Sequence, residues 1–240
     1  MKPGLVDTHS HLLPGVDDGC KTVEESIACG RVLSAAGYTP AFCTPHIWPN
    51  LSGNTGAAIP GRVARLQEAY DQAGVGLTLL PGGEMNFRPT FCETPTGDVV
   101  TYNMRRKYAL VDLWADRLPQ HFERCVRWLQ GLGVTVVLAH PERLRAVQED
   151  PGLASYFADL GLLLQGNLQC FNDRPTAATR RTADRFLADD RYWMVGSDTH
   201  GVGGLDERMA GLERLRTELD AATFDRLTRL NPAKLAGLEV

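Results

Sequence analysis

Short apolar runs separated by stretches of helical spacing constrain the fold of this chain more than any other feature. Short apolar strands that alternate with helices are typical of βα units and a mostly parallel sheet. We count about seven such runs and find no internal repeat. The predicted strands are Leu5–Thr8, Pro40–Thr44, Leu77–Leu80, Tyr108–Leu113, Val134–Ala139, Gly161–Gln165 and Tyr192–Val195.

Helical patterns fill most of the sequence between these runs. Thr22-Val23-Glu24-Glu25 predicts a capping box that opens a helix ending before Gly37. Residues 48–60 predict a loop, and residues 86–104 predict an irregular segment. Further helices are predicted at Val63–Ala73, at Gln120–Leu132, and from about Leu205 to Asn231-Pro232.

A (β/α) barrel explains the pattern better than an open doubly wound sheet. Histidine or acidic residues follow nearly every predicted strand, and barrels build their sites at the carboxyl ends of all their strands. An open sheet concentrates its site at one switch point instead. The 240 residues are 43% hydrophobic, which is enough for one barrel, so we predict a single domain over residues 1–240.

Composition excludes several classes of partner. The formal charge of −4 is spread without a basic stripe, which argues against nucleic acid. No Walker A or Gly-x-Gly-x-x-Gly sequence supports a nucleotide fold. No apolar run approaches the roughly 18 residues of a membrane helix, so we expect no direct membrane insertion. The six cysteines form no Cys-x-x-Cys pair, and Met1–Gly4 leaves no room for a signal peptide, so we expect a cytoplasmic protein.

The histidines and carboxylates at the strand ends are candidate metal ligands. His9 and His11 lie two apart on an extended segment, so both point to the same face and can bind one ion together with Asp198. Imidazole and carboxylate are ligands of catalytic Zn, Mn and Fe. Further candidates at strand ends are His46, Glu84, His140 and the turn Asp17-Asp18-Gly19. Taken alone, each of these has an ordinary structural explanation, whereas together they predict a metal cluster.

The number of candidate ligands exceeds what one ion can use. Two or three ions would clamp an oxyanion and acidify a bridging water. Such a site suits phosphoester hydrolysis, in which charge develops on the phosphate oxygens. Arg143 is placed to bind phosphate, although it could also be a surface arginine. His121 stands at a predicted helix start, where a structural role is expected.

The strings that carry these residues extend over nearly the whole chain. They are Asp7-Thr8-His9-Ser10-His11-Leu12-Leu13-Pro14-Gly15-Val16-Asp17-Asp18-Gly19, Lys21-Thr22-x-Glu24-Glu25-Ser26, Thr44-Pro45-His46, Gly83-Glu84, Ala139-His140-Pro141-Glu142-Arg143 and Ser197-Asp198-Thr199-His200. On them the chain resembles the polymerase-and-histidinol-phosphatase (PHP) superfamily. More narrowly, it resembles the bacterial protein-tyrosine phosphatases of capsule and exopolysaccharide operons.

The resemblance implies a distorted seven-stranded, TIM-like (β/α)7 barrel with a trinuclear site that prefers Mn, although Fe and Zn accept the same ligands. One ion would bind His9, His11, Glu84 and Asp198, with Glu84 bridging. A second would add Asp112 and His140, and a third would bind Asp18, His46 and His200. Arg143 would grip the phosphate, and together with Asp198 and His200 it would serve catalysis. The implied substrate is phosphotyrosine on a tyrosine kinase that controls polysaccharide export, attacked directly at phosphorus by metal-bound hydroxide.

Two positions depart from the family pattern. Asp112 stands where the family more often has Glu, which shortens its reach by one methylene. Leu205 stands near the place of a phosphate-binding arginine, a role that Arg208 would have to take.

Other functions stay open at this point. They are another PHP phosphoesterase acting on histidinol phosphate or a small sugar phosphate, a metal-dependent amidohydrolase, and a non-catalytic module that binds a kinase. No cysteine has an arginine six residues on, so a phosphocysteine route has no support. A serine hydrolase is disfavoured as well, because Gly-x-Ser-x-Gly is missing.

Overall fold

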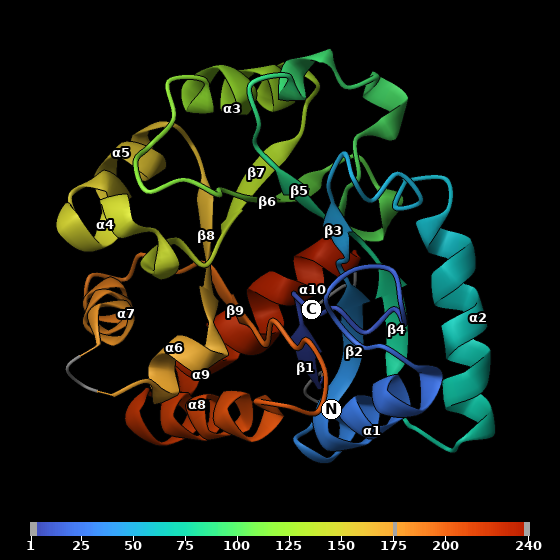
Figure 1. Ribbon diagram of the computed structural model, residues 1–240. Coiled ribbons are helices and arrows are strands. Elements are labelled where there is room, and N and C mark those ends of the chain that lie inside the picture. The colour runs from blue at the N-terminus through green and yellow to red at the C-terminus, as the bar shows by residue number, and fades with distance from the viewer. Residues whose placement is uncertain (1–3, 175–176, 238–240) are drawn as a thin grey trace.

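Two parallel sheets form the centre of the protein (Figure 1). The computed structural model describes residues 4–174 and 177–237, and the strands named below pair in parallel. The smaller sheet has the order β1 (Leu5–Asp7), β2 (Tyr38–Cys43) and β4 (Thr78–Pro81). The larger sheet has the order β3 (His46–Ile47), β5 (Glu84–Asn86), β6 (Tyr108–Asp112), β7 (Thr135–Ala139), β8 (Leu163–Asn167) and β9 (Met194–Gly196). The predicted parallel α/β class is confirmed.

Two short strands that the sequence does not predict, β3 and β5, follow β2 and β4 after a break in each case. The chain leaves the smaller sheet after β2 and enters the larger sheet at β3, with Thr44-Pro45 between them. It makes the same change between β4 and β5, at Gly82-Gly83. Proline cannot donate to a ladder, which suits Pro45 to the first break. At the second break Gly83 lies close to Val100, and an added Cβ would be 2.7 Å from the valine side chain. β3 and β5 are too short for a pattern of alternating residues to predict.

Backbone hydrogen bonds join the segment after β1 to the segment after β9. The Asp198 amide donates to the His9 carbonyl at 2.7 Å, and the His11 amide donates to the Thr199 carbonyl at 2.8 Å. Ser10 and Thr199 form an isolated parallel bridge. The carboxyl ends of the first and last strands therefore lie side by side, although they come from opposite ends of the sequence.

Helices surround the strands on the outside (Figure 1). The longer ones are α1 (Val23–Ala35), α2 (Ile59–Gln72), α3 (Phe122–Gly131), α7 (Ala178–Ala188) and α8 (Leu205–Glu218). The short ones are α4 (Arg145–Glu149), α5 (Leu153–Asp159), α6 (Leu168–Asn172), α9 (Ala221–Asp225) and α10 (Asn231–Ala236). A π-helical turn, Arg226–Leu230, leads into α10. Among the described residues, no helix is both long and apolar enough to span a membrane.

Helix ends and irregular segments follow the sequence prediction in part. Thr22 Oγ1 accepts the Glu25 amide at 3.2 Å, as a capping box requires, but the Glu25 carboxylate accepts the Lys21 amide rather than that of Thr22. The segment 86–104 is irregular as predicted and contains three 3-10 turns, Phe91–Glu93, Thr96–Asp98 and Tyr102–Met104. The last helix continues past Asn231-Pro232, because proline is tolerated in the first turn of a helix.

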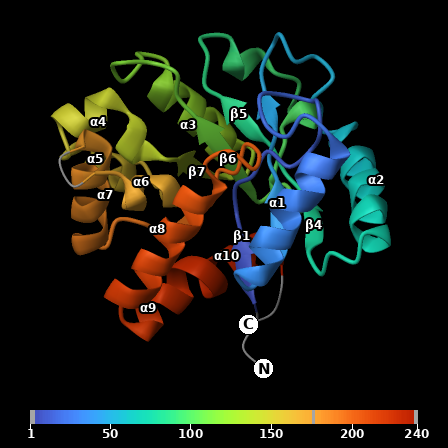
Figure 2. The same cartoon turned by 60° about the horizontal axis from the view of Figure 1, so that its bottom comes forward.

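Alternation along the strands divides the core into two apolar clusters. On β7, Val137 and Ala139 belong to the smaller cluster, whereas Val136 and Leu138 belong to the larger one. Helix α10 adds Leu235 to the smaller cluster and packs against β1 (Figure 2). The same alternation turns the polar residues that follow each strand toward a common point.

The predicted absence of a signal peptide concerns Met1–Pro3, which lie outside the described residues.

Candidate metal centre

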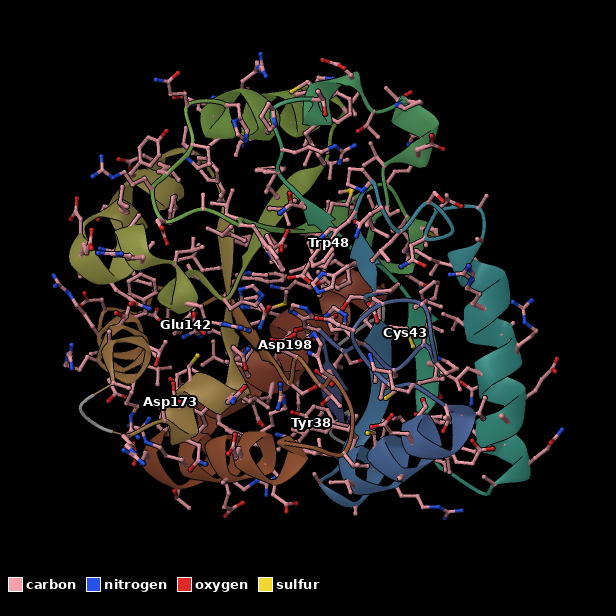
Figure 3. The ribbon with its side chains drawn as sticks, viewed as in Figure 1. Tyr38, Cys43, Trp48, Glu142, Asp173 and Asp198 are labelled. Atoms are coloured by element: carbon pink, nitrogen blue, oxygen red, sulfur yellow. The ribbon has the colours of Figure 1, made fainter. Side chains whose placement is uncertain are left out.

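Four buried side chains from three separate segments meet at the carboxyl ends of the strands. His9 and His11 follow β1, Glu84 begins β5, and Asp198 follows β9 near the centre of the molecule (Figure 3). His9 Nε2 lies 3.2 Å from His11 Nε2, 3.3 Å from Asp198 Oδ1 and 3.5 Å from Glu84 Oε2. Tetrahedral ligands about 2.1 Å from one ion are about 3.4 Å from each other. These atoms therefore have the spacing of ligands to a single metal ion.

Two hydrogen bonds orient the histidine rings for this role. His9 Nδ1 lies 2.9 Å from Gln165 Oε1, and His11 Nδ1 lies 2.8 Å from Asp17 Oδ2. Both acceptors are oxygens, so each Nδ1 carries a proton and Nε2 is the ring nitrogen left for a metal ion. Metal-binding histidines in proteins are commonly held in this way.

Several buried polar atoms of the cluster lack a hydrogen-bond partner within the described chain. They include Asp112 Oδ2 and His140 Nδ1. Glu84 Oε2 and His46 Nδ1 form no hydrogen bond of good geometry either, but they lie 2.8 Å from each other as an ion pair. Asp112 Oδ1, in contrast, accepts a hydrogen bond from Asn86 Nδ2 at 3.0 Å. A buried carboxylate oxygen without a donor is costly. A bound cation removes that cost, so the donor set fits a metal site.

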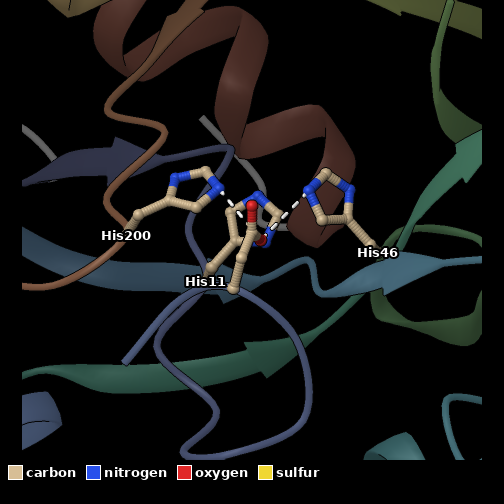
Figure 4. Close-up of side chains that lie close together, drawn as sticks. His11, His46 and His200 are labelled. Atoms are coloured by element: carbon tan, nitrogen blue, oxygen red, sulfur yellow. Dashed lines mark ion pairs between the residues drawn. The ribbon is translucent and has the colours of Figure 1, made fainter. Parts of the chain in front are cut away.

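A further group surrounds Asp18. Its Oδ1 lies 3.3 Å from His46 Nε2 and 3.5 Å from His200 Nε2. His46 and His200 lie on either side of His11 in Figure 4, and their ring centroids are 4.5 and 3.9 Å from that of His11. The Asp18 side chain is 60% exposed, so this group opens toward solvent.

The structure brings all nine predicted ligands into overlapping groups whose ligand atoms lie within 4.8 Å of one another. The groups are His11, Asp18, His46 and His200; His9, His11 and Glu84; His9, His140 and Asp198; and His46, Glu84 and Asp112. These groups differ from the sets that the resemblance implies: for example, His140 joins His9 and Asp198, and Asp112 joins His46 and Glu84. The assignment of ligands to individual ions stays a prediction.

Charge is balanced within the cluster by histidine and carboxylate together. Burial would raise the pKa of Glu84 and of Asp198, but the neighbouring histidines hold both pKa values well below the usual range. Burial alone would lower the pKa of His9, which those two carboxylates raise above its usual value. Burial and the nearby Glu84 raise the pKa of Asp112 to about 6. Asp112 thus differs from Glu84 and Asp198, whose pKa values are lowered.

Backbone strain marks two of the cluster residues. His140 has φ 35° and Asp198 has φ 53°, both in the left-handed region that non-glycine residues seldom adopt. A backbone hydrogen bond holds each residue in this conformation: the His140 amide donates to the Gln165 carbonyl at 2.7 Å, and the Asp198 amide donates to the His9 carbonyl. Such conformations cost of order 1–3 kcal/mol each and cluster at functional sites.

A cavity of about 560 Å³ opens above the cluster, and two arginines line it. Arg143 Nη1 donates to Asp198 Oδ2 at 2.9 Å, and its side chain is 49% exposed. Asn167 Nδ2 donates to the same oxygen at 2.7 Å. Arg145 is the second arginine of the lining and pairs with Glu149 on its own helix. Arg143 therefore reaches both the cluster and the open cavity.

Arg208, the candidate for the phosphate-binding role that Leu205 cannot fill, does not line the cavity. Arg208 is buried, and its Nε donates to the carbonyls of Ser197 and Asp198 at 2.9 and 3.0 Å. It therefore holds the Asp198 segment in place rather than facing a ligand. Leu205 is buried at the start of α8. His121 lies outside the cluster, with Nε2 3.2 Å from the Phe87 carbonyl, as its predicted structural role requires.

Sequence reasoning missed the residues that support the ligands. Gln165, Asn167 and Asn86 contact cluster members, and all three lie at or near the end of a strand. That position was the available signal, since Gln165 closes a predicted strand. Amides are common in loops and turns, so their type alone does not distinguish a supporting residue from a surface one.

Replacing Gln165 by leucine should weaken metal binding without unfolding the protein. The change removes the acceptor that orients His9, and such losses lower metal affinity by about 10- to 100-fold. Titration calorimetry with Mn²⁺ measures the effect. Gln130→Leu is the matched control, because Gln130 bonds the Leu160 carbonyl and Arg127, both away from the cluster. Equal affinity in Gln165→Leu and wild type would contradict the assigned role.

The fold resembles solved hydrolase structures. A structure reported for the metal-dependent tyrosine phosphatases YwqE of Bacillus subtilis and CpsB of Streptococcus pneumoniae superposes with a TM-score of 0.82 at 24% identity, covering 97% of this chain and 92% of the other. A phosphotriesterase homology protein of Escherichia coli, with phosphate in its active site, superposes with a TM-score of 0.63 at 12% identity, covering 98% and 99%.

Sequence comparison is more specific than the fold. Tyrosine-protein phosphatase YwqE of B. subtilis is 28% identical over 203 residues, covering 82% of this chain and 78% of that protein. Tyrosine-protein phosphatase CpsB of S. pneumoniae is 25% identical over 205 residues, covering 82% and 84%. The profile of the family described as capsular polysaccharide synthesis, CpsB/CapC, matches residues 5–236. This chain belongs to the CpsB/CapC family.

Proposed function

We propose that this chain is a metal-dependent phosphatase that hydrolyses phosphotyrosine in proteins. The observation that carries the proposal is the group of nine histidine and acidic residues below an open cavity whose edge holds Arg143. Membership of the CpsB/CapC family and relatives named tyrosine-protein phosphatases support it. A site with both metal ligands and a half-exposed arginine suits a phosphate ester.

The cluster is proposed to hold two or three divalent ions. The ligands are His9, His11, Asp18, His46, Glu84, Asp112, His140, Asp198 and His200. Mn is the proposed metal, since carboxylates make up four of the nine ligands, and Fe and Zn accept the same donors. When bound, such ions neutralise charge on phosphate oxygens and lower the pKa of water, which permits direct attack on phosphorus.

Three side chains beside the cluster are proposed to bind the phosphate, to position Asp198 and to bind a cation. Arg143 can turn its guanidinium from Asp198 toward a phosphate and bind two of its oxygens. Asn167 keeps Asp198 in position while Arg143 moves, because it donates to the same carboxylate oxygen. His200 lines the cavity, and burial together with the nearby His11 lowers its pKa, so its ring is neutral at pH 7 and available to a cation.

We extend the proposal to the architecture, the partner and the location. The two sheets are read as one distorted (β/α)7 barrel and one domain, supported by the hydrogen bonds between the segments after β1 and β9. The substrate is proposed to be a tyrosine kinase that controls polysaccharide export; the description of the family supports the connection with capsular polysaccharide synthesis. The cytoplasmic location remains a prediction from the sequence.

A comparison of three substrates tests the phosphatase proposal. The Mn-loaded protein should hydrolyse a phosphotyrosine peptide faster than a phosphoserine peptide or histidinol phosphate, as measured by phosphate release. EDTA should abolish the activity and Mn²⁺ should restore it, while alkylation of cysteines should leave it unchanged. Faster hydrolysis of histidinol phosphate would favour a small-molecule phosphoesterase. No hydrolysis of any of the three would favour a non-catalytic module.

Arg143→Ala should lower kcat/KM for the phosphotyrosine peptide by about 10- to 100-fold, the scale of a lost hydrogen bond to a charged group. Metal content, measured by mass spectrometry of the purified protein, should stay at the wild-type level, since Arg143 is not among the ligands. The control is Arg127→Ala, which removes an exposed arginine of α3 that pairs with Glu123. Loss of metal in Arg143→Ala would show that Arg143 supports the ligands instead.

A further inference from the structure

One wall of the cavity above the metal centre is apolar. Leu113, Trp114 and Ala115 follow the carboxyl end of β6, and Leu144 follows Arg143 on the chain. Trp114 is 70% exposed, more than any other large apolar residue described as exposed. Because the Trp114 indole is open to water, it contributes little to the apolar core, and its position beside a charged site needs another explanation.

Contacts with a second tryptophan hold the Trp114 ring in place. Its centroid lies 4.5 Å from that of Trp48 in an edge-on arrangement of 74°. Trp48, which follows β3 (Figure 3), stacks on His46 with centroids 4.0 Å apart. A row of three rings thus runs from a candidate metal ligand to the cavity wall. Because Trp114 is already positioned, a ligand that packs on it loses less conformational entropy in the complex.

The chemistry of the cavity matches one class of ligand. Arg143 supplies positive charge for a phosphate, the ions proposed for the cluster would add to it, and Trp114 lines the same cavity with an aromatic surface. An aryl phosphate places a ring directly beside its phosphate, whereas an alkyl phosphate such as phosphoserine offers no apolar group that could cover an indole. Aromatic pairs contribute beyond the area they bury.

We propose that Trp114 is the wall against which the aromatic ring of an aryl phosphate packs, and that it makes the site prefer aryl to alkyl phosphomonoesters. The proposal rests on the proposed phosphatase function and adds the residue that sets its specificity. Trp48 acts as a positioning residue, because it contacts Trp114 and does not line the cavity.

Binding of two non-hydrolysable phosphonates tests the role of Trp114 independently of turnover. Titration calorimetry on the Mn-loaded protein compares benzylphosphonate with methylphosphonate. Trp114→Ala should weaken benzylphosphonate about tenfold and leave methylphosphonate unchanged, whereas Trp114→Phe should retain most of the affinity for benzylphosphonate. The matched control is Val32→Ala, which removes an exposed apolar side chain of α1 away from the cavity. Metal content should equal that of the wild type in all variants.

Three results would overturn the inference. They are equal weakening of both phosphonates in Trp114→Ala, no weakening of benzylphosphonate, and a wild-type protein that does not bind benzylphosphonate. Hydrolysis of the phosphotyrosine peptide by the wild type, measured separately, shows whether the proposed phosphatase function stands in each case. If the wild type hydrolyses the peptide but Trp114→Ala binds both phosphonates as the wild type does, the role of Trp114 is rejected and the proposed phosphatase function stands.

Discussion

The burial of the Glu84 and Asp198 carboxylates next to His9 and His11 is the constraint on which the rest of the structure depends. An isolated carboxylate in a protein interior carries a penalty of several kcal/mol even after relaxation. Here the two carboxylates are fully surrounded by protein, and Glu84 Oε2 lies among the rings of His9, His11 and His46. Histidine nitrogens 2.8–3.6 Å from the two carboxylates offset part of this penalty. A set of divalent cations would offset the remainder.

The fold assembles this arrangement from segments that are distant in sequence. The first and last strands are joined through residues 9–11 and 198–199, and Arg208 bonds the carbonyl of Asp198 from helix α8. The breaks between β2 and β3 and between β4 and β5 place His46 and Glu84 at the start of strands in the larger sheet. Strained backbone at His140 and Asp198 aims those side chains inward. Each of these features is local, and the hydrogen bonds between the segments hold the ligand atoms together.

Periodicity and residue type predicted the parallel α/β class, seven of the strands, the helices α1, α2, α3 and α8, and a set of ligand candidates that the structure brings together. Helix α7 was not predicted. The strands β3 and β5 were missed because they are only two and three residues long, below the length at which alternation is visible. Gln165 and Asn167 were missed because their role depends on which strands are neighbours. The contact of Arg208 with the Asp198 segment could not be predicted either. From the sequence alone, an arginine near a site can equally bind a phosphate or hold the backbone in place. Trp114 gave no signal, because exposure is a property of the folded chain.

The presence of metal ions at the strand ends is tested most directly by anomalous X-ray scattering from crystals of the Mn-loaded protein. Anomalous peaks are predicted among His9, His11, Glu84 and Asp198 and within the group of Asp18, His46 and His200, with ligand distances of about 2.0–2.3 Å. A well-ordered cluster without anomalous density in Mn-loaded crystals, or manganese bound only elsewhere on the protein, would contradict the metal centre and with it the proposed phosphatase.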